Sequence, residues 1–235
     1  MGKRLMVGCL LVGMGACSGG DDGESCPDVD TTYAPVIDPA NFVAVVNNPL
    51  YPLTPGTTYT YEAGDETIVV QVTNETKVVQ GVTCIVVRDT VTVAGEVTED
   101  TFDWYAQDRD GNVWYMGEDT KEYEAGVVTS KAGSWEAGVR GAKAGIIMKA
   151  APMVGNSYRQ EYLACEAEDE AEVMATDESV TVPAGSYLHC LRTHDFTRLE
   201  PALNEDKYYC PGIGVALEIN LNTGGRLELV SRIVP

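Results

Sequence analysis

The 235-residue sequence has few basic residues. Lysine and arginine together number 16 against 36 aspartates and glutamates, so the formal net charge is −20 at pH 7. A surface this acidic repels nucleic acid and anionic lipid headgroups. The composition therefore predicts a solvated domain with no nucleic-acid partner, and any attachment to a membrane has to come from something other than the protein surface.

Histidine is scarcer still, with only His189 and His194. Positions five apart in a strand lie on opposite faces, so these two rings cannot share a metal ion without a bulge. The sequence also lacks a C-x-x-C pair, a G-x-S-x-G nucleophile elbow, a phosphate loop and a dinucleotide fingerprint. We therefore predict no catalytic residues, no metal site and no cofactor.

Long apolar runs are missing as well, and none approaches the ~20 residues that a membrane-spanning helix needs. The apolar stretch at residues 5–14 follows two basic residues and leads into Gly15-Ala16-Cys17, which is the order found in signal peptides. A cysteine directly after the small residues resembles the lipobox of bacterial lipoproteins. That resemblance implies removal of residues 1–16 and lipid on Cys17. An ordinary secretory signal is the alternative.

The segment after Cys17 is polar and rich in glycine, which is typical of a flexible tether. By resemblance to lipoprotein sorting, Ser18 is not the aspartate that retains a lipoprotein in the inner membrane. We therefore expect an exported, lipid-anchored protein of the cell envelope, at the outer membrane. The tether covers residues 17–35, and a single β domain covers residues 36–235.

From residue 57 onward, apolar and polar residues alternate in segments rich in Val, Thr, Ile, Tyr and Trp. The connections between these segments are short, and short connections permit only antiparallel neighbours. We predict a mainly β fold, a single curved antiparallel sheet (half-barrel or open barrel) built from long meandering strands, with little helix. The expected strands cover residues 57–63, 67–79, 83–94, 97–107, 112–118, 157–163, 166–178, 180–182, 187–198, 206–209, 215–221 and 226–233.

Two stretches depart from this pattern. Asp38-Pro39 is typical of a helix start, and we expect a short helix from there through about Val46. Residues 125–157 are rich in glycine and alanine, and we expect them to form a long excursion from the sheet.

Two segments carry a resemblance to known proteins. One is NPLYPLTPGTTY at residues 48–59, and the other is FDWYAQD at residues 102–108 followed by DGNVWY at residues 110–115. These segments resemble a group of uncharacterised bacterial secreted proteins and lipoproteins, over residues 36–233. The resemblance implies no activity. It implies a sheet similar to the curved antiparallel half-barrel of lipoprotein carriers.

The cysteines after Cys17 would lie in a compartment where disulfides form. A hairpin centred at residue 200 puts Cys190 opposite Cys210, so this bridge is the first choice. The alternative for these two cysteines is a metal site completed by His194, which shares a strand face with Cys190. The second predicted bridge, by elimination, joins Cys26 to Cys165. Cys84 then remains as a buried free thiol.

Aromatic residues concentrate in one predicted hairpin. Alternation places Trp104 and Tyr105 on opposite faces of one strand, and Trp114 and Tyr115 on opposite faces of the next. Trp135 lies in the excursion. Ordinary core packing is one interpretation of this group. The functional interpretation is an apolar concavity, closed by the excursion, that binds a lipid or another apolar ligand.

An enzymatic interpretation needs a cleft of carboxylates. The candidates are Asp100, Asp103, Glu118 and Glu122, but 36 acidic residues make chance proximity common. The D-x-D-x-N run at residues 108–112 resembles the start of a calcium loop, yet it lacks the loop's glycine and final glutamate at the required positions, so a hairpin turn is simpler.

We therefore predict a non-enzymatic cell-envelope lipoprotein that binds an apolar ligand or an envelope protein partner. A hydrolase or metal-dependent enzyme with an acidic cleft is the alternative.

Overall fold

The computed structural model describes residues 32–200 and 202–235 of the protein. The predicted signal peptide, Cys17, Cys26 and most of the tether lie outside the described residues, so the statements about them stay predictions. The described chain is almost entirely β-structure, as predicted, with one short 3-10 helix, η1 (Pro39–Asn41).

The strands are long in the middle of each half of the chain and short at its margins. They are β1 (Phe42–Val43), β2 (Thr58–Ala63), β3 (Glu66–Val79), β4 (Val82–Val93), β5 (Glu96–Asp108), β6 (Val113–Glu124), β7 (Val127–Ser130), β8 (Trp135–Glu136), β9 (Lys143–Met148), β10 (Ser157–Arg159), β11 (Glu161–Tyr162), β12 (Asp169–Val182), β13 (Gly185–Thr197), β14 (Asn204–Cys210), β15 (Gly214–Asn220) and β16 (Arg226–Ile233).

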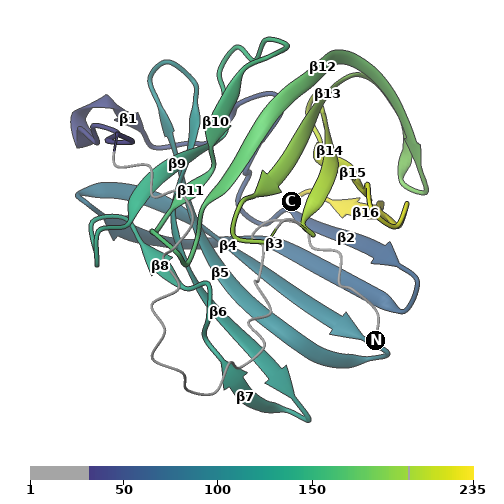
Figure 1. Ribbon diagram of the computed structural model, residues 1–235. Helices are drawn as coiled ribbons and strands as arrows, with labels where there is room; N and C mark the ends of the chain where they lie inside the picture. The colour runs from purple at the N-terminus through teal and green to yellow at the C-terminus, as the bar shows by residue number, and fades with distance from the viewer. Residues whose placement is uncertain (1–31, 201) are drawn as a thin grey trace.

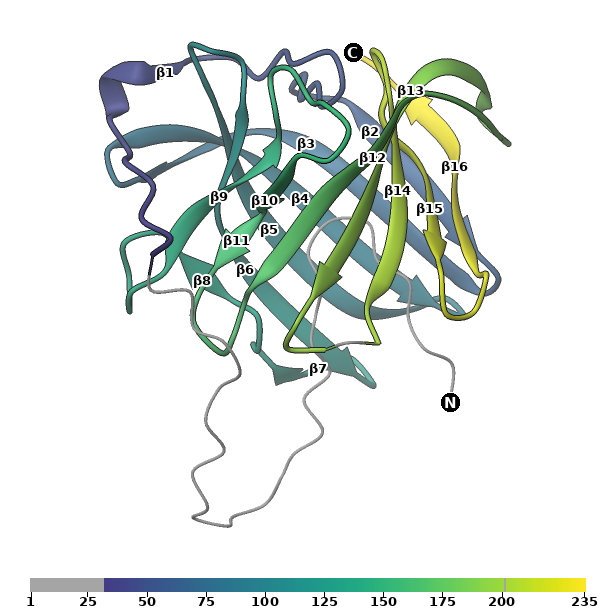
Figure 2. The ribbon, with the colours of Figure 1, turned by 45° about the horizontal axis from the view of Figure 1, so that its top comes forward.

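These strands form one antiparallel sheet, whose main path runs β10-β12-β13-β14-β15-β16-β2-β3-β4-β5-β6-β9-β11. Off this path, β1 pairs with β5, and β7 and β8 pair with β6. The sheet curls into a nearly closed barrel (Figures 1 and 2). This confirms the predicted single curved sheet, and the barrel is more closed than a half-barrel. We call β2–β6 the first wall and β12–β16 the second wall. The walls join along β16 and β2.

The strands of the first wall follow one another as a continuous meander, because the turns between them have a backbone twist that matches that of the strands. Gln80-Gly81 joins β3 to β4, and Ala94-Gly95 joins β4 to β5. All four of these residues have a positive φ. Positive φ at both central residues is typical of the type I′ turn, whose twist matches the right-handed twist of the flanking strands.

The opposite side of the barrel closes at a seam, where one segment changes its partner. β10 pairs with β12, and after Gln160 the chain continues as β11, which pairs with β9. The Gln160 N–H donates to the Asp169 carbonyl at 2.8 Å. A Cβ on Gly145 of β9 would lie 2.2 Å from the carbonyl carbon of Gln160. The seam therefore requires glycine at position 145.

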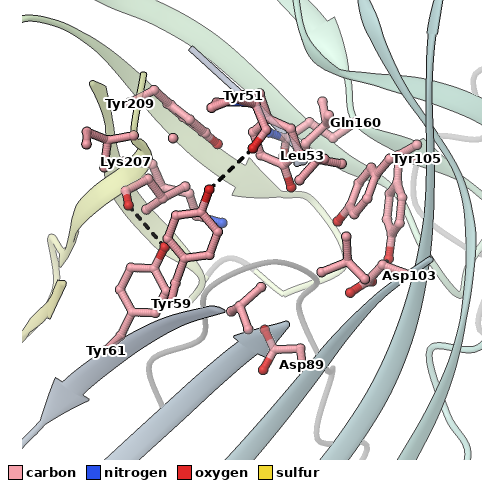
Figure 3. Close-up of a pocket in the computed structure, with 18 of the residues that line it drawn as sticks. Tyr51, Leu53, Tyr59, Tyr61, Asp89, Asp103, Tyr105, Gln160, Lys207 and Tyr209 are labelled. Atoms are coloured by element: carbon pink, nitrogen blue, oxygen red, sulfur yellow. Dashed lines mark hydrogen bonds between the residues drawn. The ribbon is translucent and has the colours of Figure 1, made fainter. Parts of the chain in front are cut away.

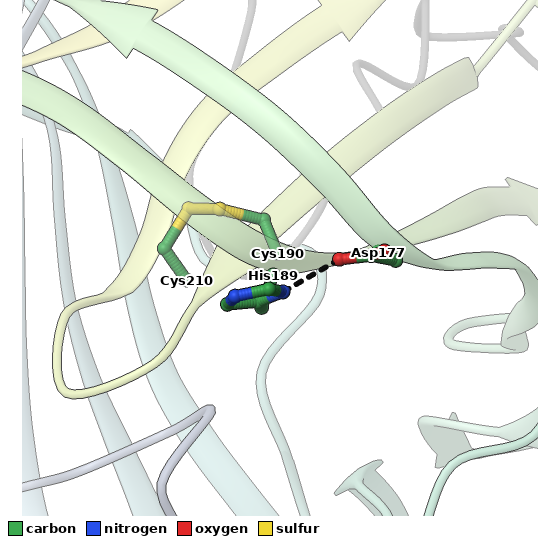
Figure 4. Close-up of a disulfide and its surroundings, with 4 residues drawn as sticks. All are labelled: Asp177, His189, Cys190 and Cys210. Atoms are coloured by element: carbon green, nitrogen blue, oxygen red, sulfur yellow. Dashed lines mark hydrogen bonds and ion pairs between the residues drawn. A yellow bond between two sulfur atoms is a disulfide. The ribbon is translucent and has the colours of Figure 1, made fainter.

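The second wall bends where its strands lose register. The β12–β13 pairing shifts between Val173 and Val180, and His189 opposite this region has a φ of 57°. The Cys190–Cys210 disulfide links β13 to β14 beside the bend, with Cα atoms 4.2 Å apart (Figure 4). This bridge confirms the first predicted pairing and excludes the alternative metal site at these two cysteines.

The other cysteine predictions have different outcomes. Cys84 is a buried free cysteine, as predicted. Cys165 is disulfide-bonded. Because Cys26 lies outside the described residues, the Cys26–Cys165 pairing stays a prediction.

Two local predictions were wrong. The helix expected through Val46 ends after one 3-10 turn, because Phe42 and Val43 pair with β5 as strand β1. The predicted start is correct, since the Asp38 side chain accepts a hydrogen bond from the Ala40 N–H at 3.0 Å.

The excursion at residues 125–157 instead contributes short strands to the sheet. It contains β7, β8 and β9, which all pair with β6. Gly117 of β6 permits one of these pairings, because a Cβ there would lie 2.4 Å from the Trp135 carbonyl oxygen. Throughout the described ranges, the structure has no helix with the length and apolar character needed to span a bilayer.

Candidate functional site

A cavity lies inside the barrel, between the two walls and under the arm at residues 48–56. Its volume is about 60 Å³. Six tyrosines contribute to its lining together with aliphatic residues. They are Tyr51, Tyr59, Tyr61, Tyr105, Tyr115 and Tyr209. The charged residues that line it are Asp89, Asp103, Glu161, Asp169 and Lys207.

The arm is fixed across the barrel by specific hydrogen bonds. The Gln107 side-chain oxygen accepts from the N–H groups of Asn47 and Asn48, both at 2.8 Å. The Asn48 amide donates to the carbonyls of Gly111 and Lys149. At the second wall, the Gly212 N–H donates to the Pro49 carbonyl at 2.7 Å. The arm thus bridges both walls.

Tyr51 and Leu53 of the arm close the cavity from above (Figure 3). The Tyr51 ring lies between Tyr105 of the first wall, at 5.5 Å between ring centroids, and Tyr209 of the second wall, at 6.2 Å. Tyr105 in turn stacks on Tyr115 at 4.8 Å. The cavity is therefore surrounded by aromatic faces from three separate parts of the chain.

The hydroxyl groups of two further tyrosines bind backbone carbonyls. The Tyr59 hydroxyl donates to Pro52 at 3.3 Å, and the Tyr61 hydroxyl donates to Val215 at 3.0 Å. Burial raises the pKa of Tyr61 well above its ordinary value, so this hydroxyl stays protonated. The hydroxyl groups of both tyrosines are thus already hydrogen-bonded to the backbone, and their rings line the cavity.

The first wall contributes two buried aspartates. Asp89 of β4 and Asp103 of β5 are 4% and 2% exposed. Burial, together with the nearby Asp103 and Glu99 carboxyls, raises the pKa of Asp89 well above its ordinary range. Burial also raises the pKa of Asp103 to about 7, although a hydrogen bond from the Tyr115 hydroxyl at 2.6 Å opposes this shift.

The second wall contributes the one lysine that lines the cavity. The Lys207 ammonium lies 3.6 Å from the Asp195 carboxylate and 3.7 Å from the Glu218 carboxylate. Burial alone would lower the pKa of Lys207, but these neighbouring carboxylates outweigh it and raise the pKa well above its ordinary value. Lys207 is therefore charged and serves as the counter-ion of its own wall.

Of the five aromatic residues predicted to form a ligand surface, two line the cavity and the three tryptophans do not. Tyr105 and Tyr115 line the cavity. Trp104 lies on the opposite strand face, under the Lys77 ammonium at 3.2 Å from the ring centroid. Trp114 donates from its indole N–H to Asp108 at 2.9 Å. Trp135 packs behind Tyr115, at 5.2 Å between ring centroids.

The other candidates from the sequence do not converge on one site. The Asp108 carboxylate accepts from the Asn112 backbone and side-chain N–H groups, so this D-x-D-x-N run is a hydrogen-bonded hairpin turn. His189 pairs with Asp177 at 2.6 Å on the exposed surface beside the disulfide (Figure 4). His194 stacks on Phe196 instead.

The carboxylates proposed for an acidic cleft are brought together only in part. Asp103 and Glu118 are direct partners across β5 and β6 and both are buried, whereas Glu122 is opposite Glu99 further along the same strands. Asp100 pairs with Arg88 at 2.7 Å, away from the cavity-lining Asp103. Glu118 accepts from the buried Thr120 hydroxyl at 3.0 Å. Within residues 32–200 and 202–235, no group of three or more His, Cys, Asp or Glu side chains could hold a metal ion.

Tyr51, Asp89 and Lys207 were not predicted from the sequence as site residues, and neither were Tyr59, Tyr61 and Tyr209. Strand alternation could have placed Asp89 on the same face as Val87 and Val91, and a charged residue between two apolar ones on one face is a signal of a buried charge. Nothing in the sequence indicated that the proline-rich arm would place Tyr51 inside the barrel.

Comparison with known proteins adds little to this description. No family model and no curated protein matches the sequence. Among solved structures, the chain is similar to a protein from Parabacteroides distasonis that is provisionally described as a lipoprotein. The two are 11% identical, and the match covers 79% of this chain and 99% of the other, with a TM-score of 0.42. A likeness of this degree carries no argument about function.

Proposed function

We propose that the chain is a lipid-anchored, non-enzymatic protein of the cell envelope that holds a small ligand in the tyrosine-lined cavity of its barrel. The anchor is Cys17, on the strength of the lipobox-like sequence before it. The Cys190–Cys210 disulfide supports export, because disulfides persist in oxidising compartments.

The observation that carries the binding role is the closure of the cavity by Tyr51. A concave, mostly apolar site with a few convergent polar groups is the usual form of a small-molecule site. Here Tyr51 reaches across from the arm to contact Tyr105 and Tyr209, so the cavity has a roof that does not belong to the sheet.

The size of the cavity limits the ligand. Sites for drug-sized molecules have volumes of roughly 300–1,000 Å³, whereas this cavity has about 60 Å³. With the arm in place, the cavity accepts a ligand or headgroup of a few heavy atoms. The arm has to move aside for the rest of any larger molecule.

Mass spectrometry of the protein extracted in mild detergent from its own membrane tests both parts of the proposal. Acyl mass on the mature chain, lost in Cys17→Ala, is the result expected for the anchor. A soluble form without added mass contradicts lipidation.

For the ligand, we expect a reproducible small molecule that stays bound under native conditions. Val70→Phe fills the cavity from β3 and should abolish this binding, because Val70 is part of the lining. Val69→Phe, on the exposed face of the same strand, is the matched control. A protein that never carries a small molecule, or that keeps it in Val70→Phe, contradicts the binding role.

A further inference from the structure

Asp89 is a buried acid without a counter-ion. Its carboxyl lines the cavity, the residue is 4% exposed, and its Oδ1 atom has no hydrogen-bond partner. Among the described residues, Asp89 takes part in no ion pair. A buried carboxyl without a partner costs free energy, so such a group is rare unless a partner arrives from outside.

Asp103 adds a second carboxyl to the same part of the cavity. Val87 is directly opposite Asp103, and Asp89 is opposite Thr101, so the two aspartates are diagonal neighbours on β4 and β5. Such positions are about 7–8 Å apart. The Tyr115 hydroxyl binds only one Asp103 oxygen, Oδ1. The two acids thus approach one region of the cavity floor (Figure 3).

The tyrosines around the floor favour a positive charge as well. The face of an aromatic ring attracts a cation through the negative side of its quadrupole, most strongly where water is excluded. Tyr59 and Tyr105 line the cavity next to these acids. A neutral or anionic ligand would gain nothing from the ring faces beyond apolar contact.

Lys207 does not reverse this preference. Its ammonium already lies within 4 Å of both Asp195 and Glu218, so two carboxyl groups neighbour its single positive charge. An anionic ligand at Lys207 would have to displace one of them. The other charged residues that line the cavity, Asp89, Asp103, Glu161 and Asp169, are all acids.

We infer that the ligand of the cavity carries an alkylammonium group, which binds between Asp89 and Asp103 with its carbon chain against the tyrosine rings. This inference rests on the proposed function, since it names the chemical class of the ligand for that same cavity. The ammonium supplies the donor that Asp89 lacks, and the chain fills the apolar part of the lining.

The test compares three probes of similar length that differ in charge, by NMR titration of the folded wild-type protein. These are n-butylammonium, 1-butanol and butyrate. Hydrogen bonds to charged groups are stronger than those between neutral groups, so we expect n-butylammonium to bind at least about tenfold more tightly than 1-butanol, and butyrate most weakly of all. Equal or tighter binding of 1-butanol or butyrate overturns the inference.

Variants locate the binding. Asp89→Asn and Asp103→Asn should each weaken n-butylammonium binding at least about tenfold and leave 1-butanol binding unchanged. Asp119→Asn is the matched control, because this acid of the adjoining strand β6 pairs with Lys121 at 2.9 Å on the exposed side. Unchanged n-butylammonium binding in both cavity variants overturns the inference. The wild-type comparison needs no variant, so a variant that fails to fold leaves it intact.

The two proposals can fail separately. If all three probes bind alike and Val70→Phe blocks them, the cavity is a ligand site but not a cation site. If no probe binds while a native ligand is retained, the cation inference falls and the binding role stands. If neither a probe nor a native ligand binds, both proposals are wrong.

Discussion

On the second wall of the barrel, Lys207 lies within 4 Å of two buried carboxyl groups, whereas on the first wall Asp89 and Asp103 face the same cavity without an ion pair among the described residues. Both walls are long antiparallel strands with alternating faces. They differ in whether the buried negative charge is balanced by a residue of the same wall.

The difference shows two ways to bury acids. On the first wall, burial raises the pKa of Asp103 to about 7, and the acid is partly protonated at neutral pH. On the second wall burial raises the pKa of Glu218 as well, but the positive charge of Lys207 opposes the shift. Lys207 therefore reduces the cost of burying acids on the second wall without removing it, since burial also raises the pKa of Asp169 in β12 to about 7. Asp89 and Asp103 have no such cation beside them among the described residues.

Removing the balance of the second wall should have the largest effect. Lys207→Met leaves Asp195 and Glu218 buried without their cation, and breaking one side of a buried ion pair costs about 3–5 kcal/mol. Urea unfolding at pH 7 measures this loss. Lys121→Met, at an exposed ion pair on the first wall, should stay within about 0.5 kcal/mol. Equal effects of the two substitutions would mean that Lys207 balances nothing.

The second wall is also linked by a disulfide beside its bend, between β13 and β14. The Cys190–Cys210 bridge closes a loop with a sequence separation of 20, which restricts the unfolded chain by about 3 kcal/mol. The double substitution to alanine should lower the free energy of unfolding by about that amount. Cys84→Ala, which removes a buried thiol but no bridge, should cost only about 1 kcal/mol. A double variant as stable as the wild type would show that the bend holds without its bridge.

The pH dependence of stability should report the buried Asp103 of the first wall. The pKa of Asp103 is about 7 in the folded protein and about 4 in the unfolded chain. Between these values the folded state binds a proton that the unfolded state lacks, so stability falls as pH rises from about 4 to 7. The slope from one such group is up to about 1.4 kcal/mol per pH unit.

Asp103→Asn should remove the part of this slope that Asp103 contributes, because the amide stays neutral and keeps an oxygen for the Tyr115 hydroxyl. Asp169, whose pKa burial also raises to about 7, should go on contributing its own part. Unfolding experiments across this pH range measure the change. Asp119→Asn, at an exposed carboxylate, should leave the slope as it is. An Asp103→Asn protein with the wild-type slope would place the titrating group elsewhere.

Much of the fold could be predicted from the sequence because the local signals agree with the tertiary structure. Period-two alternation located the long strands and separated Trp104 from Tyr105, and the hairpin centre at residue 200 predicted the Cys190–Cys210 bridge. The helix predicted after Pro39 failed because pairing with β5 outweighed the local helix signal.

The cavity could not be predicted in the same way. Alternation says which residues share a face, but not which face becomes the interior when the sheet curls. The pairing of Lys207 with Glu218 depends on the register between β14 and β15, and the position of Tyr51 depends on contacts that the arm makes with both walls. These are consequences of closure, which no short segment encodes.

The most direct measurement of the difference between the walls is a titration of the side-chain carboxyl carbons by NMR, with Asp89 and Asp103 assigned through their asparagine variants. Asp103 should titrate near pH 7, and Asp89 should titrate well above its ordinary range. Saturating n-butylammonium should shift both titrations to lower pH, because the cation stabilises the charged carboxylates. Titration of both aspartates near pH 4 in the free protein would contradict the account.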